Sequence, residues 1–295
     1  MRVNQPIRDT IMPLNIQPTD ATLGAIVTDV DLAKLNDSTW DEILAAFYEY
    51  GVLIFPIQHL SAQGQLAFAK RFGEIEILVD DLTTIPISNQ DEDGSMLEED
   101  SHFMKLLIGN EGWHTDSSYV PLSAKASVLS AHVLPSSGGE TEWADPRAGY
   151  DALDDATKER IANLNAYHSY FASQAKIGHK VAVGAGYGFF EGEPPLRPLT
   201  KVHPVTGRTA LYIGRHAGKI PGLEDSEASQ LLEELTTITC APSRTFSHSW
   251  NPGDIAVWDN RCVLHRARPY DHSQVRVMEH TRIKGDPRTE SALNA

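Results

Sequence analysis

The first third of the chain shows helix-like spacing of apolar residues around one short apolar run. After Ser38, a candidate N-cap, apolar residues recur at positions i, i+3, i+4 and i+7, at Trp40, Ile43, Leu44 and Phe47. Gly51 can end this helix, and VLIFP at 52–56 reads as a buried strand. Ser61 is expected to begin a second helix through Phe68. Two more helices are predicted over 154–164 and 225–235.

The middle and the C-terminal third are dominated by strand-like segments separated by turn residues. These segments cover 126–134, 209–214, 245–250, 254–259 and 275–283. The pattern does not alternate strand with helix, so it predicts a mainly β fold with flanking helices around a jelly-roll core, a double-stranded β-helix. Because no internal repeat or low-complexity linker interrupts it, one domain over 1–295 is expected.

Charge narrows the range of partners. The chain has 40 Asp and Glu against 25 Lys and Arg, a formal net charge of −15 at pH 7. Binding to nucleic acid or to an anionic membrane surface depends on clustered positive charge, so neither partner is expected. The two cysteines, Cys240 and Cys262, cannot form a disulfide framework, and the first 18 residues lack the apolar segment of a signal peptide. A cytoplasmic location is therefore expected.

The segment WHTDSSY at 113–119 contains candidate metal ligands. In extended backbone, His114 and Asp116 project to the same side. His265, in WDNRCVLHRARPY at 258–270, could supply a third ligand. Two histidines and one carboxylate on one side of an ion form a facial triad that leaves coordination positions open and suits Fe(II). Read alone, His-x-Asp is common by chance, and a satisfied polar histidine with a turn-forming aspartate is the simpler alternative.

A positively charged residue follows in the last predicted strand. If that strand is regular, Arg276, Met278, His280 and Arg282 share one face. A guanidinium buried in a barrel needs an anionic partner, and a carboxylate held by two hydrogen bonds is a common one.

Together these motifs resemble the Fe(II)- and 2-oxoglutarate-dependent family of taurine dioxygenase and dichlorophenoxyacetate dioxygenase, TauD/TfdA. The resemblance runs from GAIVTDVDL at 24–32 to KGD at 284–286 and includes FAKRFGEIE, GGETEW, KVHPVTGR and WDNR. Within the family, the segments LIFPIQHLS, SQAKIGH, PLRPLTKVHP and IGRHAGKIPG are most similar to enzymes that cleave (S)-2-phenoxypropionate herbicides.

The resemblance implies roles for individual residues. His114, Asp116 and His265 match the iron ligands. Arg276 matches the arginine that pairs with the distal carboxylate of 2-oxoglutarate, and Thr141 matches the threonine that hydrogen-bonds the same group.

The primary-substrate pocket is less defined by the resemblance. Asn110 matches a polar residue of that pocket, whereas His280 stands where the taurine enzyme has a second arginine for the sulfonate. Arg215 is therefore predicted to pair with a substrate carboxylate, aided by His216 or His280; a solvated surface arginine is the equal alternative. Lys105 is a weaker candidate.

Other polar residues are given structural interpretations. Residues 258–261 are expected to brace the barrel around His265, and His248 is expected to be a core histidine. Strand parity puts Cys262 on the face opposite His265. The acidic stretch 91–100 is most simply a solvated loop, with a lid over the site as the alternative.

The sequence thus predicts an iron dioxygenase that uses O₂ and 2-oxoglutarate to hydroxylate a small anionic substrate. An aryloxyalkanoate such as (S)-2-phenoxypropionate would yield a phenol, a 2-oxo acid, succinate and CO₂. Two alternatives remain: the same chemistry on another carboxylate or an alkylsulfonate, and a non-catalytic metal-binding β-barrel using His114 and His265. A homo-oligomer is expected.

Overall fold

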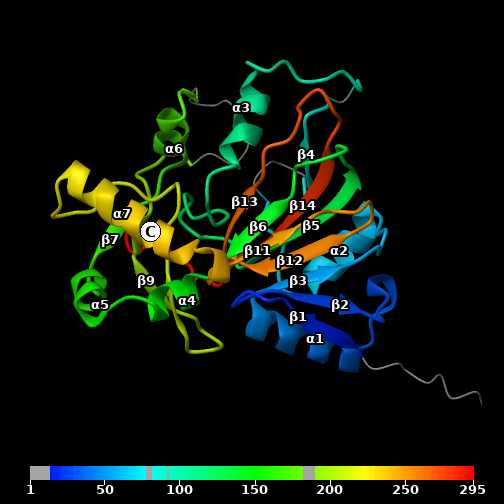
Figure 1. The fold of residues 1–295 in the computed structure, drawn as a ribbon, viewed down its shortest axis with the longest axis horizontal. Coiled ribbons are helices and arrows are strands. Elements are labelled where there is room, and N and C mark those ends of the chain that lie inside the picture. The colour runs from blue at the N-terminus through cyan, green and yellow to red at the C-terminus, as the bar shows by residue number, and fades with distance from the viewer. Residues whose placement is uncertain (1–13, 78–81, 92, 182–189) are drawn as a thin grey trace, which may run out of the picture.

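The computed structural model describes residues 14–77, 82–91, 93–181 and 190–295, so most of the N-terminal segment considered above lies outside it. Its centre is a seven-stranded sheet with helices on its outer side (Figure 1). In spatial order the strands are β1 (Asn15–Pro18), β2 (Ala25–Thr28), β3 (Val52–Phe55), β12 (Ile255–Asp259), β5 (Ala126–Val133), β14 (Val277–Ile283) and β4 (Ile85–Ser88). All neighbours pair antiparallel except β2 and β3, which are parallel.

A second sheet has three antiparallel strands, in the order β11 (Thr245–His248), β6 (Thr141–Ala144) and β13 (Leu264–Ala267). Two short pairs complete the strands: β9 (Thr200–Val202) with β10 (Thr209–Leu211), and β7 (Asn165–Tyr167) with β8 (Leu196–Pro198). The prediction of a mainly β protein with flanking helices is confirmed.

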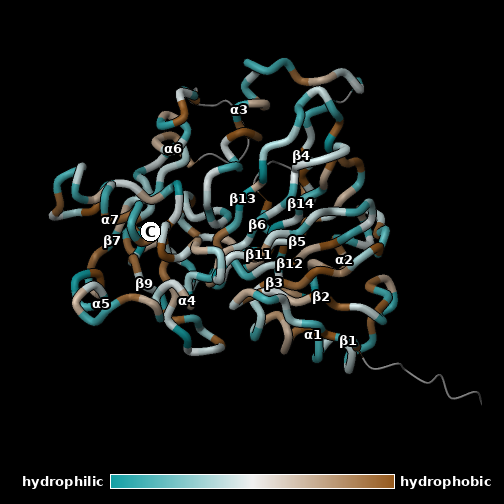
Figure 2. Tube along the Cα trace, in the orientation of Figure 1, coloured by the Kyte–Doolittle hydropathy of each residue, from teal (hydrophilic) through white to brown (hydrophobic). Residues whose placement is uncertain are grey.

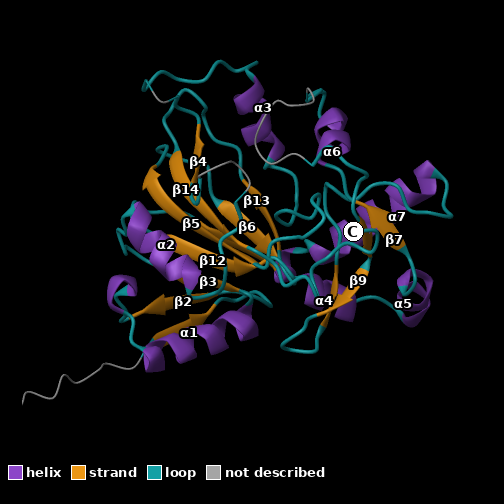
Figure 3. Ribbon diagram, turned by 180° about the vertical axis from the view of Figure 1, so that it is seen from behind, coloured by secondary structure: helices purple, strands orange, loops and turns teal. Residues whose placement is uncertain are grey.

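The helices cover the sheets from several sides, as the reverse view shows (Figure 3). They are α1 (Asp37–Tyr50), α2 (Ala62–Lys70), α3 (His102–Gly109), α4 (Pro146–Asp151), α5 (Asp155–Ile161), α6 (Tyr170–Lys176) and α7 (Asp225–Thr239). Single turns of 3-10 helix lie at Leu32–Lys34 and Pro242–Arg244. Among the described residues, no helix combines the length and hydrophobicity needed to cross a bilayer.

The large sheet is buried on both faces, which explains the apolar run at its centre. Leu53 and Phe55 of β3 face a core beneath α1 and α2, whereas Val52 and Ile54 face a second core on the other side. Strand β12 alternates in the same way. Hydrophobic colour accordingly gathers where β3 and β12 run (Figure 2). A strand enclosed on both sides needs apolar residues at every position.

The predicted helix boundaries shift where the capping chemistry differs from expectation. Asn36, not Ser38, caps α1: its side chain accepts a 2.9 Å hydrogen bond from the Thr39 amide. Gly51 ends α1 as predicted, with a φ of 72° that glycine adopts without a steric penalty. Ser61 caps α2 as predicted. Helix α7 continues to Thr239, four residues beyond its predicted end.

Candidate metal centre and active site

The three predicted ligands come together at the junction of the sheets. His114 and Asp116 lie on the segment that follows α3, and His265 lies on β13. Two backbone hydrogen bonds join His114 to His265, at 2.9 and 2.8 Å. One ligand atom from each of His114, Asp116 and His265 lies within 4.8 Å of the others, and all three residues are buried. The spacing suits one shared divalent ion.

The protonation states of His114 and His265 suit metal binding. The Nδ1 of His114 lies 2.8 Å from the Gly112 carbonyl oxygen, which can only accept, so Nδ1 carries the proton and Nε2 is the free base. Burial lowers the pKa of His114 to about 4 despite the opposing charge of Asp116. Burial and His114 also hold the pKa of His265 well below its usual range. Both rings are therefore neutral at physiological pH, the state that binds metals.

Asp116 is held as an ionised carboxylate. Burial alone would raise its pKa, but the positive charge of Arg282, together with the adjacent His265 and His280 rings, outweighs that effect and holds the pKa well below its usual range. The Ser127 hydroxyl donates to Oδ2 at 2.7 Å. Asn260 in turn donates to Ser127 at 2.9 Å and accepts from the Asp116 amide at 3.2 Å. These contacts fix the carboxylate that the metal would share.

Arg282 lies behind the carboxylate. Its Nε lies 3.5 Å from Asp116 Oδ1, and its Nη1 lies 3.4 Å from the Ser117 hydroxyl oxygen. Ser117 adopts a left-handed φ of 54° and donates to Glu76 at 2.7 Å. Burial raises the pKa of Glu76, against the opposing effect of Arg282.

A cavity of about 480 Å³ opens from the metal ligands. Both sheets contribute to its wall, and so do α3 and α6. Its apolar side consists of Leu82, Ile85, Ile87, Leu97, Phe103, Leu106, Leu107 and Leu129. Asp91 and Leu97, from the acidic stretch predicted to be a loop, also line it. The described part of that stretch is almost wholly exposed, and residue 92 lies outside the described residues.

The predicted 2-oxoglutarate residues share this cavity. Arg276 and Thr141 both line it and are 5% and 3% exposed. Arg276 donates to the Gly139 carbonyl at 3.1 Å and lies over the Tyr270 ring, but its Nε has no partner among the described residues. A buried guanidinium without a carboxylate fits an anionic ligand. Gly139, with a φ of 72°, leaves space for the Arg276 side chain, because a Cβ at this position would lie 3.1 Å from Arg276 Nε.

The residues predicted to bind the primary substrate divide into two groups. Asn110, His216 and His280 line the cavity. His280 stacks on Trp258, with ring centroids 5.6 Å apart, and its Nε2 lies 3.5 Å from Asp116 Oδ2. His280 is therefore part of the cavity wall and lies next to Asp116, a candidate metal ligand.

The hydrogen bonds around His216 leave its Nε2 as a hydrogen-bond acceptor. Ser173 donates its hydroxyl proton to the Tyr170 carbonyl at 2.7 Å, so the 2.9 Å contact with His216 requires a proton on His216 Nδ1. Burial and Arg215 hold the pKa of His216 well below its usual range. Its Nε2 then carries a lone pair, and this geometry does not support the predicted donation to a substrate carboxylate.

Arg215 and Lys105 do not belong to the described cavity wall. Arg215 donates to the Gly109 carbonyl oxygen and, at 3.0 Å, to Gln174, so it joins the end of α3 to α6. A Cβ on Gly109 would lie 2.6 Å from the same guanidinium. The structure thus places Arg215 in a helix junction beside the cavity and not on the surface as a solvated arginine. Its pairing with a substrate carboxylate stays a prediction.

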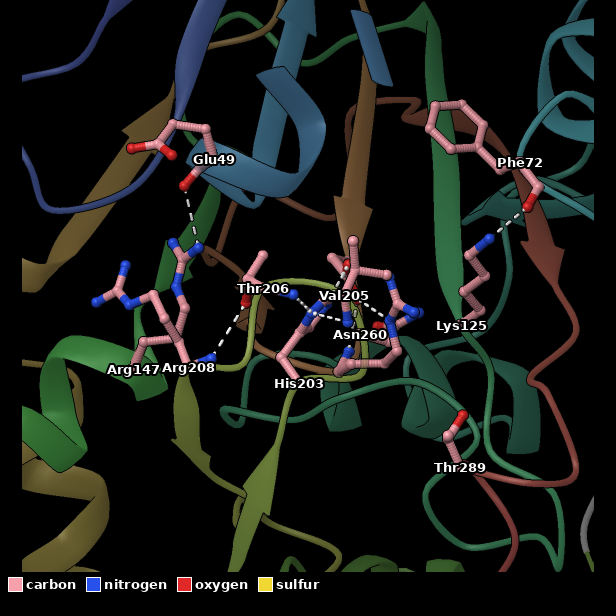
Figure 4. Close-up of polar contacts among 12 residues, drawn as sticks. Glu49, Phe72, Lys125, Arg147, His203, Val205, Thr206, Arg208, Asn260 and Thr289 are labelled. Carbon is pink, nitrogen blue, oxygen red and sulfur yellow. Dashed lines mark hydrogen bonds and ion pairs between the residues drawn. The ribbon is translucent and has the colours of Figure 1, made fainter. Parts of the chain in front are cut away.

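A second cluster has metal-binding residue types, His203, Asp259 and Cys262, with ligand atoms within 4.8 Å of one another. His203 Nδ1 accepts from the amides of Val205 and Thr206, at 3.2 and 3.1 Å (Figure 4). Nε2 must therefore carry the proton that it donates to Asp259 at 3.0 Å. Arg261 also binds Asp259 through two nitrogens, at 2.8 and 2.6 Å. The cluster is satisfied internally and has no histidine lone pair for an ion.

Two structural interpretations change in detail. His248 is half-buried and not fully in the core, and its Nε2 forms a 3.0 Å hydrogen bond with Asp254. Cys262 lies away from the candidate metal centre as predicted, but in a turn between β12 and β13 rather than at an alternating strand position. Residues 258–261 do brace the site: Trp258 packs on His265 and donates to Asn260.

Comparison with known proteins identifies the family. Residues 15–282 match the family model described as taurine catabolism dioxygenase TauD, TfdA family. The chain belongs to the TauD/TfdA family. The sequence-based resemblance is thereby confirmed.

Among curated TauD/TfdA relatives, an (S)-phenoxypropionate/alpha-ketoglutarate-dioxygenase from Sphingobium herbicidovorans is 51% identical, covering 95% of this chain and 98% of that protein. A protein of the same name from Delftia acidovorans is 48% identical, covering 95% and 98%. The solved structure of AAD-2 in complex with Mn(II) and N-oxalylglycine superposes with a TM-score of 0.87, at 37% identity, covering 96% of this chain and 99% of that one.

Sequence reasoning missed several residues of the site. Ser127 is a polar residue within a buried strand, and that exception was its only signal. Arg282 was placed on the face of Arg276 and His280 without a role. Tyr119 and Tyr170 line the cavity, but isolated aromatic residues give no such signal in a sequence.

Proposed function

We propose that this protein is an Fe(II)- and 2-oxoglutarate-dependent dioxygenase that hydroxylates an aryloxyalkanoate such as (S)-2-phenoxypropionate. The observation that carries the proposal is one cavity containing both parts of such a site. These are the neutral His114 and His265 with ionised Asp116, and the buried Arg276, whose Nε has no partner among the described residues. The (S)-phenoxypropionate relatives support the substrate class.

The donor set fits a facial iron site. His114, Asp116 and His265 would hold the metal, and Arg276 with Thr141 would hold the distal carboxylate of 2-oxoglutarate. When bound, the two groups supply the coupling of O₂ reduction to decarboxylation of 2-oxoglutarate, which yields succinate, CO₂ and a hydroxylated substrate carbon. A non-catalytic metal barrel has no use for the buried Arg276, so that alternative is not favoured.

The chain's own residues contribute binding, orientation and exclusion of water. The apolar wall formed by α3, β4 and Leu129 suits an aryl ring. Hydroxylation at the carbon beside the ether oxygen gives a hemiketal, which collapses to a phenol and a 2-oxo acid. Asn110 and His280 are proposed to contact the primary substrate, because both line the same cavity.

We also propose a specific architecture for the sheets and a single domain. The seven-stranded sheet and the three-stranded sheet both contribute to the cavity wall, an arrangement that supports a double-stranded β-helix core within one catalytic domain. Assembly as a homo-oligomer and a cytoplasmic location remain part of the proposal.

Succinate formation across a substrate panel tests the function. With Fe(II), ascorbate and O₂, (S)- and (R)-2-phenoxypropionates, phenoxyacetates, simple carboxylates and alkylsulfonates are compared for 2-oxoglutarate consumption and phenol release. We expect stoichiometric phenol and succinate with at least one aryloxyalkanoate. Succinate formation confined to sulfonates or non-aryl carboxylates would overturn the substrate class, and none with any substrate would overturn the enzyme class.

A further inference from the structure

The hydroxyl group of Thr141 has a fixed direction. The indole Nε1 of Trp250 donates to Thr141 Oγ1 at 3.0 Å. An indole N–H can only donate, so this contact occupies a lone pair of the threonine oxygen and leaves its own proton unused. No described residue is recorded as the acceptor of that proton. Because Thr141 lines the cavity, its donor can serve a ligand there.

Trp250 itself lies outside the described cavity wall, and other aromatic side chains pack against its ring. Its ring meets the His248 ring edge-on, with centroids 4.9 Å apart, and lies 6.3 Å from the ring of Trp143. His248 is anchored by a 3.0 Å hydrogen bond to Asp254, which also accepts from the Ile57 amide at 2.9 Å. The indole is thus fixed by contacts that need no ligand.

The Thr141 hydroxyl donor lies near a second donor, Arg276. Arg276 lines the same cavity, and its Nε is unpartnered within the described part of the chain. Strand pairing places Thr141 at the start of β6, two residues after Gly139, whose carbonyl accepts from Arg276. The charged Arg276 guanidinium and the neutral Thr141 hydroxyl are therefore two donors on the same part of the cavity wall. This combination suits a carboxylate.

We propose that Trp250 is a positioning residue that fixes the Thr141 hydroxyl as a donor and thereby selects a 2-oxo acid with a distal carboxylate. The inference rests on the proposed function, because it presupposes that 2-oxoglutarate binds beside Arg276. Trp250 acts through Thr141 and does not touch the ligand.

Ligand binding without turnover tests this role. Protein loaded with Mn(II) is titrated calorimetrically under anaerobic conditions with 2-oxoglutarate and with 2-oxopentanoate, which lacks the distal carboxylate. In Trp250→Phe, the Kd for 2-oxoglutarate is expected to rise about three- to tenfold, the effect of one neutral hydrogen bond. The Kd for 2-oxopentanoate is expected to stay unchanged. Trp40→Phe, which alters an indole in the α1 core, is the matched control and should change neither Kd.

A double-mutant cycle shows whether the effect passes through Thr141. Thr141→Val should weaken 2-oxoglutarate binding, and Thr141→Ser should restore it. Adding Trp250→Phe to Thr141→Val should cause no further loss.

The outcomes separate the inference from the function on which it rests. An unchanged Kd for 2-oxoglutarate in Trp250→Phe, equal weakening of both 2-oxo acids, or full additivity with Thr141→Val would overturn the role of Trp250 alone. Failure of the wild-type Mn(II) protein to bind 2-oxoglutarate would overturn both proposals. Thermal unfolding of each variant identifies any loss of folded protein.

Discussion

Among the described residues, two buried clusters contain a histidine, an aspartate and a third residue with a metal-binding side chain. In the candidate centre, His114 Nδ1 faces a carbonyl oxygen, so Nε2 keeps its lone pair. In the other cluster, His203 Nδ1 faces two amide protons, so Nε2 must carry a proton. Asp259 is also bound through both oxygens by Arg261 and His203.

The difference shows that residue type and proximity do not define a metal site. What separates the clusters is which atoms around each imidazole donate and which accept, since these neighbours fix the tautomer. The open cluster has unused acceptor atoms facing a cavity, whereas the closed cluster is a structural network.

The largest expected effect comes from removing a ligand of the open cluster. His265→Ala should weaken Mn(II) binding more than about 1,000-fold and abolish Fe(II)-dependent turnover, because losing a ligand costs more than losing one of its supporting contacts. Calorimetry with Mn(II) measures the affinity. His203→Ala is the matched control and should retain one Mn(II) per chain. Retained affinity in His265→Ala would contradict the assignment.

A second test opens the closed cluster. Asp259→Ala leaves the Arg261 guanidinium buried without its carboxylate and should lower the free energy of unfolding by about 3 kcal/mol or more. Urea denaturation measures this loss, and the Mn(II) stoichiometry of the folded fraction should remain one. Destabilisation below about 1 kcal/mol would show that the ion pair is not a structural network.

The smallest expected effect, counted per pH unit, is the pH dependence of the stability of the metal-free protein. Burial lowers the pKa of His114 to about 4, so between pH 6.5 and 4 the unfolded chain takes up a proton that the folded protein does not. Stability should therefore fall as the pH falls through this window, by up to about 1.4 kcal/mol per pH unit from this group. Urea denaturation at several pH values should give a shallower slope for His114→Ala than for wild type. Equal slopes would contradict the depressed pKa.

The candidate metal ligands could be brought together from sequence because their signal is local or carried by family motifs. His114 and Asp116 occupy one short segment, and Arg276 and His280, which were placed on one face of the last predicted strand, both line the cavity although Arg276 precedes β14. The role of Arg215 could not be predicted, since it depends on how closely Gly109 and Gln174 approach from two different helices. Likewise, the tautomer of His216 depends on a serine 43 positions away, whose proton is already used.

Many elements of the fold were predictable, but their pairing was not. Strand-like segments bounded by turn residues identified the strands near 126–134 and 254–259, and the apolar run identified β3. The helices α3, α4 and α6 were not predicted. Nothing in those patterns indicates that β12 lies between β3 and β5, because strand order depends on contacts between segments far apart in the sequence.

The backbone pairing of His114 with His265 also bears on how the protein folds. The two residues are about 150 positions apart, and closing a chain segment of that length carries a large entropic cost before any contact compensates it. The candidate centre should consequently form late, after both sheets have associated. Metal uptake during refolding would then follow the appearance of the native topology and not precede it, so the ion would report completed folding rather than nucleate it.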